Sequence, residues 1–334
     1  MQVTTKKKCV ALFSGGLDSM ISMKLMSDQG IDVTALHIDM GFGAKKSKKD
    51  LLEKRATSVG AKLRIADITE QYIKDILFTP KYGYGKNLNP CVDCHGNMLA
   101  VAKKVMVEIG ADFIVTGEVI GQRPKSQKKD AMKIVTEIGV GIDDVDLVLR
   151  PMSAKLLEPT KAEIKGWVDR EKLLGLSGRN REVQLNFAKE YGFEDYETPG
   201  GGCLLTDIGF TKKIKESVKF SKFDVEELSV LKVGRHLRLP DGAKLVLGKD
   251  QKDNETMRTL ELTKYNVMDV VDVPSPLALL SSNISDQDRN LAIKIILTHT
   301  KALASNKYDV NIAGTIYSDS PFEAKEATRE YFVN

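Results

Sequence analysis

The sequence predicts an α/β fold, in which a parallel sheet flanked by helices precedes a smaller α+β domain. Short apolar runs alternate with helical patterns up to residue 117, and this alternation is typical of parallel sheets. Hydrophobic residues make up 42% of the chain and charged residues 29%, an ordinary globular balance. A length of 334 residues accommodates two or three domains of roughly 100–200 residues each.

Four apolar runs in the first half predict fully buried strands. They span residues 9–13, 32–39, 62–66 and 112–117. Helical patterns lie between them at residues 20–26, 51–59 and 97–109. Right-handed crossovers in such a unit make all the strands parallel, and ligands then bind at the carboxyl edge of the sheet.

The pattern changes after residue 150, and we expect domain boundaries near residues 150 and 206. Residues 159–191 are predicted to be helical, because charged residues are interleaved with apolar ones. Residues 197–203 contain a proline and three consecutive glycines, which predict an irregular loop. Beyond this loop, residues 231–247 predict a β-hairpin with a Pro-Asp-Gly turn.

Charge and cysteine content argue against several classes of protein. The 50 basic and 46 acidic residues give a net charge of +4, and no apolar stretch approaches the roughly 18–20 residues that span a bilayer. Only five apolar residues follow the N-terminal lysines, too few for a signal peptide. Four cysteines are too sparse for a disulfide scaffold and favour a reducing compartment. We therefore expect a cytoplasmic protein with no membrane partner.

Residues 14–19, Ser-Gly-Gly-Leu-Asp-Ser, lie between the first strand and the first helix. Backbone N–H groups and the positive end of a helix dipole meet at such a position, and glycines let an anion approach closely. The hydroxyl groups of Ser14 and Ser19 can add hydrogen bonds. Neither the Walker A pattern nor G-x-G-x-x-G occurs in the chain. The loop is therefore predicted to bind phosphate by another arrangement.

This loop resembles the pyrophosphate-binding loop of the N-type ATP pyrophosphatases, the PP-loop family. The resemblance implies a HUP-type fold, like that of the adenine nucleotide alpha hydrolases, and makes residues 1–150 an ATP-binding and adenylation domain. It implies cleavage of ATP between its α- and β-phosphates, with Mg²⁺ and with Asp18 in a catalytic role. The ATP-binding residues that it implies are Ser14, Gly15, Gly16, Asp18 and Ser19 at the phosphates, Leu36, Ile38 and Asp39 near adenine and ribose, and Gly117 in a second turn.

The cysteines favour one branch of this family. Cys91 and Cys94 form a C-x-x-C in an N-P-C context, and Cys203 follows in the glycine-rich loop of the segment 151–206. This arrangement resembles that of the tRNA thiouridine synthetases, which include the 2-thiouridylases and the 4-thiouridine synthetases. The resemblance implies that tRNA is the substrate and that these three cysteines are catalytic.

Three thiols permit two sulfur-transfer chemistries. In the first, Cys203 carries a persulfide, and Cys91 or Cys94 resolves the product by disulfide exchange. In the second, all three cysteines ligate irons of a [4Fe–4S] cluster whose fourth iron holds the transferable sulfide. The cluster is favoured because the C-x-x-C supplies two ligands at standard spacing. Both chemistries need a sulfur donor, a protein persulfide or sulfide, and both need thiolates, which a helix N-terminus favours.

Two simpler explanations of the C-x-x-C remain open. His95 can complete a zinc site with the three cysteines, although adjacent ligands on one metal are strained. Alternatively, Cys91 and Cys94 only pack in the protein interior.

Arg123 and Lys125 lie in a basic segment just after the fourth predicted strand. Adenylation needs positive charge near the α-phosphate, so we expect Arg123 to bind ATP. A basic surface loop without such a role is the alternative.

The last third of the chain, residues 207–334, resembles an NFACT-type RNA-binding domain. The resemblance lies in residues 233–242 and 247–255 and implies contact with tRNA. Its candidate basic side chains are Arg235, Arg238, Lys249 and Lys252. Nineteen basic and nineteen acidic residues leave the region without net charge, so a purely structural hairpin remains the alternative.

The resulting hypothesis is an ATP-dependent tRNA sulfurtransferase, which adenylates a base carbonyl, replaces its oxygen with sulfur and releases AMP and pyrophosphate. One alternative is an adenylating carbon–nitrogen ligase for a small metabolite, but it would leave the cysteines idle and lacks an apparent glutaminase segment. The other alternative is a non-catalytic RNA-binding adaptor, which would not need an intact loop at residues 14–19.

Overall fold

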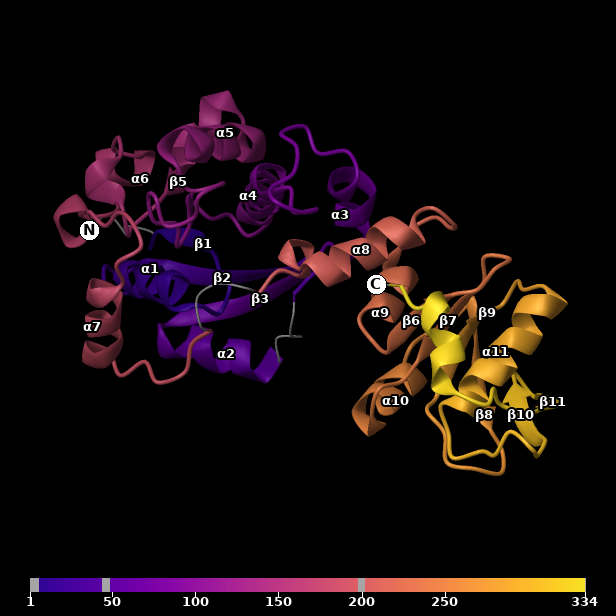
Figure 1. Ribbon diagram of the computed structural model, residues 1–334. Helices are drawn as coiled ribbons and strands as arrows, with labels where there is room; N and C mark the ends of the chain where they lie inside the picture. The colour runs from indigo at the N-terminus through magenta and orange to yellow at the C-terminus, as the bar shows by residue number, and fades with distance from the viewer. Residues whose placement is uncertain (1–5, 44–48, 198–201, 334) are drawn as a thin grey trace. The chain divides into compact units, whose positions relative to one another are not determined.

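The computed structural model describes residues 6–43, 49–197 and 202–333, and the chain divides into two compact units, residues 1–206 and 207–334 (Figure 1). The first unit contains a five-stranded parallel sheet in the order β3-β2-β1-β4-β5, which confirms the predicted fold class. Its strands are β1 (Lys8–Leu12), β2 (Asp32–Asp39), β3 (Ala61–Asp67), β4 (Phe113–Val115) and β5 (Val148–Leu149). The two residues of β5 are too few to leave a pattern in the sequence, whereas the four predicted strands are confirmed as β1 to β4.

Helices cover both faces of this sheet. They are α1 (Leu17–Ser27), α2 (Lys49–Ser58), α3 (Thr69–Tyr72), α4 (Cys91–Glu108), α5 (Lys129–Val140), α6 (Lys161–Ile164) and α7 (Glu182–Glu190). Cys9 and Ala11 of β1 pack with α1 and α2 on one face, and Val10 packs with α4 and α5 on the other. Alternate residues of a strand point to opposite faces, so strands covered on both sides are apolar throughout.

Helix α4 begins at Cys91 rather than at residue 97, where its apolar pattern starts. Gly96 weakens the helical signal of the first turns, but the packing requires it. A Cβ atom on Gly96 would lie 2.5 Å from Ile138 Cγ2 of α5, and one on Gly139 would lie 2.3 Å from Leu99 Cβ. The close approach of α4 and α5 therefore needs both glycines, and the C-x-x-C lies in the first turn of α4.

The prediction of continuous helix over residues 159–191 is wrong. Only α6, α7 and a short 3₁₀ turn at Arg170–Lys172 are helical in this stretch. Gly166 and Gly178 have φ angles of 66° and 81°, which a right-handed helix does not admit. The alternation of charged and apolar residues here reflects partial burial of an irregular segment.

The second unit contains a six-stranded antiparallel sheet in the order β11-β10-β8-β9-β7-β6. Its strands are β6 (Arg235–Arg238), β7 (Lys244–Leu247), β8 (Tyr265–Val270), β9 (Ala278–Ser281), β10 (Tyr308–Ile312) and β11 (Thr315–Asp319), and its helices are α8 (Ile208–Ser217), α9 (Val225–Leu231), α10 (Gln251–Arg258) and α11 (Asp286–Thr298). Apolar residues of α11 pack on one face of the sheet, and those of α9 and α10 pack on the other. The predicted hairpin is confirmed as β6 and β7, with His236 paired to Val246.

Within the described ranges, none of the helices has the length and apolar composition needed to cross a membrane.

Candidate active site

The loop of residues 14–19 joins β1 to the N-terminus of α1 at the carboxyl edge of the sheet. Gly15 has a φ angle of 79°, which glycine adopts without strain, and Gly16 is the N-cap of α1. The Ser14 hydroxyl accepts a hydrogen bond from the Gly16 N–H (3.3 Å), and the Ser19 hydroxyl donates to the Gly16 carbonyl (2.7 Å). The N–H groups in the first turn of α1 lack helical acceptors, so this loop has the geometry of an anion site.

Asp18 has one carboxylate oxygen with a partner and one without. Its Oδ2 accepts a hydrogen bond from Gln122 Nε2 at 3.2 Å. Its Oδ1 is buried and has no hydrogen-bond partner among the residues that the structure describes. Because an unpaired buried carboxylate oxygen is costly, this atom suits a bound cation. The contact with Gln122 was not predicted, since a glutamine in a basic loop carries no distinctive signal.

A second segment of the chain closes one side of the loop. Arg55 of α2, only 5% exposed, donates hydrogen bonds to Asp195 (2.8 Å) and to Glu197 (3.1 Å). The Glu197 N–H donates to the Gly15 carbonyl at 2.9 Å. A Cβ atom on Gly15 would lie 3.0 Å from Arg55 Nη1, so these groups are packed directly against the phosphate loop. The sequence did not reveal this arrangement, because Arg55 and its partners lie 140 and 142 residues apart.

Gly117 lies directly after β4 and packs against the start of α1. A Cβ atom there would lie 2.7 Å from the Ser19 nitrogen, 2.8 Å from the Ser19 Cα and 2.9 Å from the Asp18 carbonyl carbon. All three atoms are backbone, which cannot move aside as a side chain can. Gly117 therefore fixes how closely the turn after β4 approaches the phosphate loop, whereas its contact with a nucleotide stays a prediction.

The end of β2 lies beside β1 at the same edge of the sheet. Leu36 is 0% exposed, so its side chain offers no surface to a nucleotide, while Ile38 is nearly buried. The Asp39 carboxylate accepts a hydrogen bond from the Gly41 N–H at 2.8 Å. His37 Nδ1 lies 2.9 Å from the Phe13 carbonyl oxygen, which indicates a structural role. Nucleotide contact by Leu36, Ile38 and Asp39 stays a prediction, and burial of Leu36 gives it no support.

The structure brings Cys91, Cys94 and Cys203 close together. The Leu204 N–H donates to the Phe42 carbonyl (2.9 Å), and Cys203 pairs with Gly43 in an isolated antiparallel bridge just after β2. Thr198 to Gly201 of the predicted glycine-rich loop lie outside the described residues. On the other side, the Asn87 side chain donates to the Thr206 carbonyl (2.7 Å), which holds this segment near the start of α4.

The surroundings of Cys94 and Cys203 favour the neutral form of these two thiols. The Cys94 thiol points to Met40, with 3.3 Å between the two sulfur atoms, and the Tyr72 hydroxyl donates to it. The pKa of Cys94 is raised to about 12, mainly by burial and next by the nearby Cys203. Cys91 also raises this pKa, and the hydrogen bond from Tyr72 lowers it without offsetting these effects. Burial also raises the pKa of Cys203, with a contribution from Cys91. The expectation that a helix N-terminus would favour thiolates is therefore wrong for Cys94, because burial outweighs the dipole.

The three thiols fit an iron–sulfur cluster in chemistry, and they can ligate three of the four irons of a [4Fe–4S] cluster. The Cys91 thiolate would raise the pKa of Cys94 and of Cys203, the Cys203 thiolate would raise that of Cys94, and bound iron would relieve that repulsion. Within residues 6–43, 49–197 and 202–333, however, no group of three or more His, Cys, Asp or Glu side chains is already arranged to hold a metal ion. Metal binding by Cys91, Cys94 and Cys203 stays a prediction.

His95 belongs to a separate polar network. Its Nδ1 lies 3.2 Å from Glu118 Oε1, and its Nε2 lies 3.4 Å from the Ser126 hydroxyl. The other oxygen of Glu118 accepts a hydrogen bond from Arg150 Nε at 3.0 Å, and Arg150 also donates to Thr136 (2.9 Å). Both ring nitrogens of His95 face these partners, which argues against the zinc alternative. The sequence did not reveal this network, because its members come from four separate segments.

We expect Glu118→Gln to lower the free energy of unfolding by about 3 kcal/mol near pH 7, since it leaves the Arg150 charge buried without its partner. Burial alone would raise the pKa of Glu118, but Arg150 and His95 outweigh it and lower that pKa to about 2. The folded pKa is thus below the ordinary 4.5, so the stabilisation is complete above about pH 5 and is lost as the pH falls toward 2. Urea unfolding near pH 7 and near pH 3 measures this difference, which should shrink at the lower pH.

The control is Glu108→Gln, which removes an exposed ion pair with Arg64 (2.7 Å) and should cost no more than about 0.5 kcal/mol. Equal stability of the two variants near pH 7 would contradict the expectation for Glu118.

Arg123 and Lys125 lie on the exposed surface of the segment between β4 and α5. Two contacts hold this segment in place: the Gln122 side chain donates a hydrogen bond to Asp18, and the Ser126 hydroxyl lies beside His95. The positions are compatible with a charge near the phosphates, and the role of Arg123 stays a prediction.

In the second unit, some of the basic side chains that were predicted to bind RNA already have protein partners. Arg238 donates to both oxygens of Glu216 (2.5 and 3.0 Å) and to the Gly242 carbonyl (2.7 Å), so its guanidinium has structural partners. Lys249 lies 3.9 Å from Asp253 and is half exposed. The sequence of the hairpin therefore could not show which arginines are free to bind RNA and which, like Arg238, bind other groups of the protein.

Two family models match the chain. Residues 4–158 match the model described as Thiamine biosynthesis protein (ThiI), and residues 234–332 match the model described as NFACT protein RNA binding domain. The two matches fall in different compact units.

Curated proteins resemble the first part of the chain. A probable tRNA sulfurtransferase of Thermococcus kodakarensis is 31% identical over 157 residues, which cover 44% of this chain and 41% of that protein. A tRNA-specific 2-thiouridylase MnmA of Sulfurimonas denitrificans is 32% identical over 123 residues, 34% of this chain and 35% of that protein. The chain thus matches less than half the length of these two relatives.

Among solved structures, a 4-thiouridine synthetase in complex with RNA and ATP aligns with a TM-score of 0.38 and 19% identity, over 68% of this chain and 52% of that one. A likeness of this size carries no weight for function.

Proposed function

We propose that the chain is an ATP-dependent tRNA sulfurtransferase of the PP-loop type, because residues 4–158 match the model described as Thiamine biosynthesis protein (ThiI) and residues 234–332 match the model described as NFACT protein RNA binding domain. The observation that carries the proposal is that the phosphate loop and the three cysteines lie at the same edge of the parallel sheet. The phosphate loop follows β1, and the cysteine pair and Cys203 gather beside the end of the adjacent strand β2. A carbon–nitrogen ligase would use the first feature and have no use for the second.

Adenylation is the first step of the proposed reaction. The carbonyl oxygen of a tRNA base attacks the α-phosphorus of ATP, and the bond from this phosphorus to pyrophosphate breaks. Backbone N–H groups from Gly15 onward and the Ser14 and Ser19 hydroxyls bind the departing phosphates. The unpartnered Oδ1 of Asp18 would hold Mg²⁺, which when bound would balance the charge of these phosphates. Arg123 adds positive charge at the α-phosphate.

Sulfur transfer is the second step. A sulfur nucleophile adds to the activated carbon of the base, and AMP leaves with the former carbonyl oxygen. We propose that Cys91, Cys94 and Cys203 hold a [4Fe–4S] cluster, which when bound supplies an open iron position for a sulfur ligand. The protein holds the thiols of the C-x-x-C in place through hydrogen bonds: the Asn89 side-chain amide donates to Cys91 Sγ (3.2 Å), and the Tyr72 hydroxyl donates to Cys94.

The persulfide route is the alternative chemistry for the same residues. A Cys203 persulfide, loaded by a protein donor, would attack the activated carbon and form a disulfide link between the base and Cys203 as AMP leaves. A thiol of the C-x-x-C would then attack Cys203 Sγ, form a protein disulfide and release the thiolated base. A dithiol reductant would restore the thiols.

The experiment that tests the function is thionucleoside formation in vitro. Purified full-length protein is incubated with tRNA, ATP and Mg²⁺, in one reaction with sulfide and in another with a protein persulfide donor and a dithiol reductant, and the digested tRNA is examined by mass spectrometry. We expect an ATP-dependent thionucleoside, with one AMP and one pyrophosphate released for each. Pyrophosphate release with a product that contains no sulfur would favour the ligase, and RNA binding without pyrophosphate release would favour the adaptor.

Iron content distinguishes the two sulfur chemistries. After anaerobic reconstitution we expect about four irons and four acid-labile sulfides per chain, with broad visible absorption. Serine at Cys91 or Cys94 should remove most of this iron, whereas Cys9→Ala, which changes a fully buried cysteine of β1, should keep it. Thionucleoside formation from the protein persulfide donor, by protein that holds no iron after reconstitution, would overturn the cluster and leave the persulfide route.

A further inference from the structure

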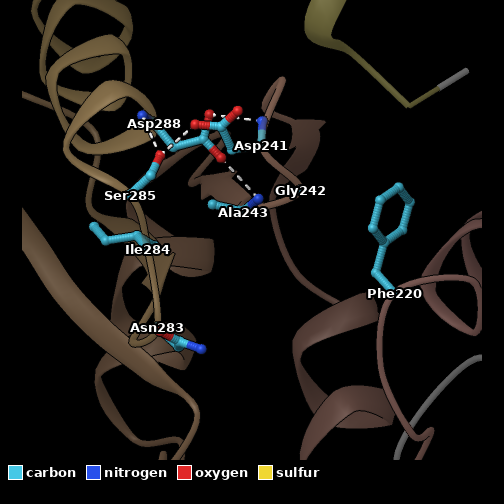
Figure 2. Close-up of a pocket in the computed structure, with 8 residues that line it drawn as sticks. All are labelled: Phe220, Asp241, Gly242, Ala243, Asn283, Ile284, Ser285 and Asp288. Atoms are coloured by element: carbon cyan, nitrogen blue, oxygen red, sulfur yellow. Dashed lines mark hydrogen bonds between the residues drawn. The ribbon is translucent and has the colours of Figure 1, made fainter.

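The second unit contains a cavity of about 460 Å³ between the α8–α9 connection, the β6–β7 turn and the start of α11 (Figure 2). It is lined by Phe220, Asp241, Gly242, Ala243, Asn283, Ile284, Ser285 and Asp288. This volume lies within the range of roughly 300–1,000 Å³ that is usual for small-molecule sites. The proposed catalytic chemistry uses none of these residues.

Phe220 supplies an aromatic surface that is already held in place. Its side chain is 52% exposed, and the guanidinium of Arg238 lies over the ring at 4.1 Å from the centroid. Arg238 is itself held by Glu216 and by the Gly242 carbonyl. One ring face thus rests on a fixed cation, while the exposed part of the ring borders the cavity. An exposed aromatic ring with a fixed orientation is the usual platform for an unpaired nucleobase.

The acidic end of the cavity combines a buried carboxylate that has hydrogen-bond partners with exposed polar groups that are free to bind a ligand. The buried carboxylate of Asp288 accepts hydrogen bonds from the Asp241 N–H (3.1 Å) and the Ala243 N–H (2.9 Å), so it holds the turn. The Ser285 hydroxyl donates to Asp241 Oδ2 (2.5 Å). Asp241 Oδ1 and the side-chain amide of Asn283 have no hydrogen-bond partner within the described ranges. Figure 2 shows Asp241 and Phe220 on opposite sides of the cavity.

The charge around Phe220 suits the backbone of RNA. Residues 208–223 contain five lysines and one glutamate, although residues 207–334 as a whole carry no net charge. The single glutamate, Glu216, is paired with Arg238. Lys219 and Lys222 flank Phe220, are exposed and form no ion pair with any described residue. Lysines on either side of an aromatic ring can bind the phosphates that flank a stacked base.

We propose that this cavity binds one unpaired guanine of RNA, which stacks on Phe220. The two adjacent donors of guanine, N1–H and N2–H, match the carboxylate of Asp241, whose Oδ1 is free and whose Oδ2 keeps one acceptor position beside its hydrogen bond from Ser285. The O6 of guanine matches the side-chain amide of Asn283. The lysines beside Phe220 bind the adjoining phosphates. The inference deepens the proposed function, because it assigns to the RNA-binding unit a base-specific contact with the substrate. An acidic wall would repel phosphate, so the base rather than the backbone enters the cavity.

The test measures fluorescence anisotropy of labelled uridine oligomers that contain one central guanine or one central adenine, with the full-length protein. We expect the guanine oligomer to bind more tightly, and Phe220→Ala to weaken it on the order of tenfold, as for loss of one stacked base. Phe220→Tyr keeps a stacking ring and should bind like wild type. Asp241→Asn should abolish the preference for guanine over adenine. The control is Ile316→Ala, which removes a similarly exposed apolar side chain (53%) from β11 and should change nothing.

Two results would overturn the proposal: Phe220→Ala and Ile316→Ala binding alike, or Asp241→Asn keeping the guanine preference. Thionucleoside formation by the wild-type protein is measured in parallel. If the wild-type protein thiolates tRNA but binds the guanine and adenine oligomers equally, the cavity proposal is wrong and the proposed reaction stands. A guanine preference that depends on Phe220, in a protein that forms no thionucleoside, removes the proposed reaction and supports the cavity.

Discussion

Replacing Cys203 by serine is expected to lower thionucleoside formation by at least about a thousandfold, while tRNA-dependent release of pyrophosphate continues. Serine keeps the size and the backbone bridge to Gly43, but its oxygen neither ligates iron nor carries a persulfide. Adenylation depends on the phosphate loop and does not use the thiol. The measurement is the ratio of thionucleoside, by mass spectrometry, to pyrophosphate, by a coupled assay.

The matched control is Cys9→Ala, since Cys9 is a free cysteine in the core, near the start of β1, and has no proposed role. It should keep the ratio of products near that of the wild type. Full thionucleoside formation by Cys203→Ser would remove Cys203 from the chemistry and leave only the C-x-x-C.

The second large effect is expected from Gly117→Ala. The new Cβ atom would lie under 3 Å from three backbone atoms of Asp18 and Ser19, so either α1 or the turn after β4 has to shift. Overpacking of this kind costs about 1–3 kcal/mol of stability. A displacement on the order of 1 Å at a phosphate site can cost on the order of a hundredfold in function. We therefore expect ATP affinity, measured by calorimetry, to fall about a hundredfold.

Gly209→Ala is the control for this substitution. Gly209 lies in the first turn of α8, where an added Cβ atom would make only an ordinary contact of 3.4 Å with Asp207 Oδ1. Its ATP affinity and Tm should match those of the wild type. If Gly117→Ala binds ATP as tightly as Gly209→Ala does, the close approach of the turn after β4 has no bearing on the nucleotide.

The parallel sheet and the phosphate loop were predictable because their signals are local. Each buried strand is a continuous apolar run, and the loop is six consecutive residues between a strand and a helix. The start of α4 was predicted too late, since Gly96 is a poor helix former that is retained for packing against Ile138. A propensity signal cannot register a contact between residues that are far apart in the sequence.

The same limit explains what was missed in the site. In the sequence, nothing distinguishes Arg55 from any other arginine in a helix, because its partners Asp195 and Glu197 meet it only in the folded chain. The resemblance singled out the three cysteines, but it could not give the pKa of Cys94, because the burial that raises this pKa comes from side chains of other elements. Reading charge state from a motif requires knowledge of its surroundings.

The hydrogen bonds from Glu197 to Gly15 and from Leu204 to Phe42 also bear on where the chain can be cut. The ThiI-family match ends at residue 158, yet both bonds are donated by residues beyond it. A fragment trimmed to the matched range would keep the phosphate loop but lose one of its walls and the third thiol. Truncation, domain exchange or fusion that aims to keep the site whole should therefore place its junction after Thr206, at the boundary of the first compact unit.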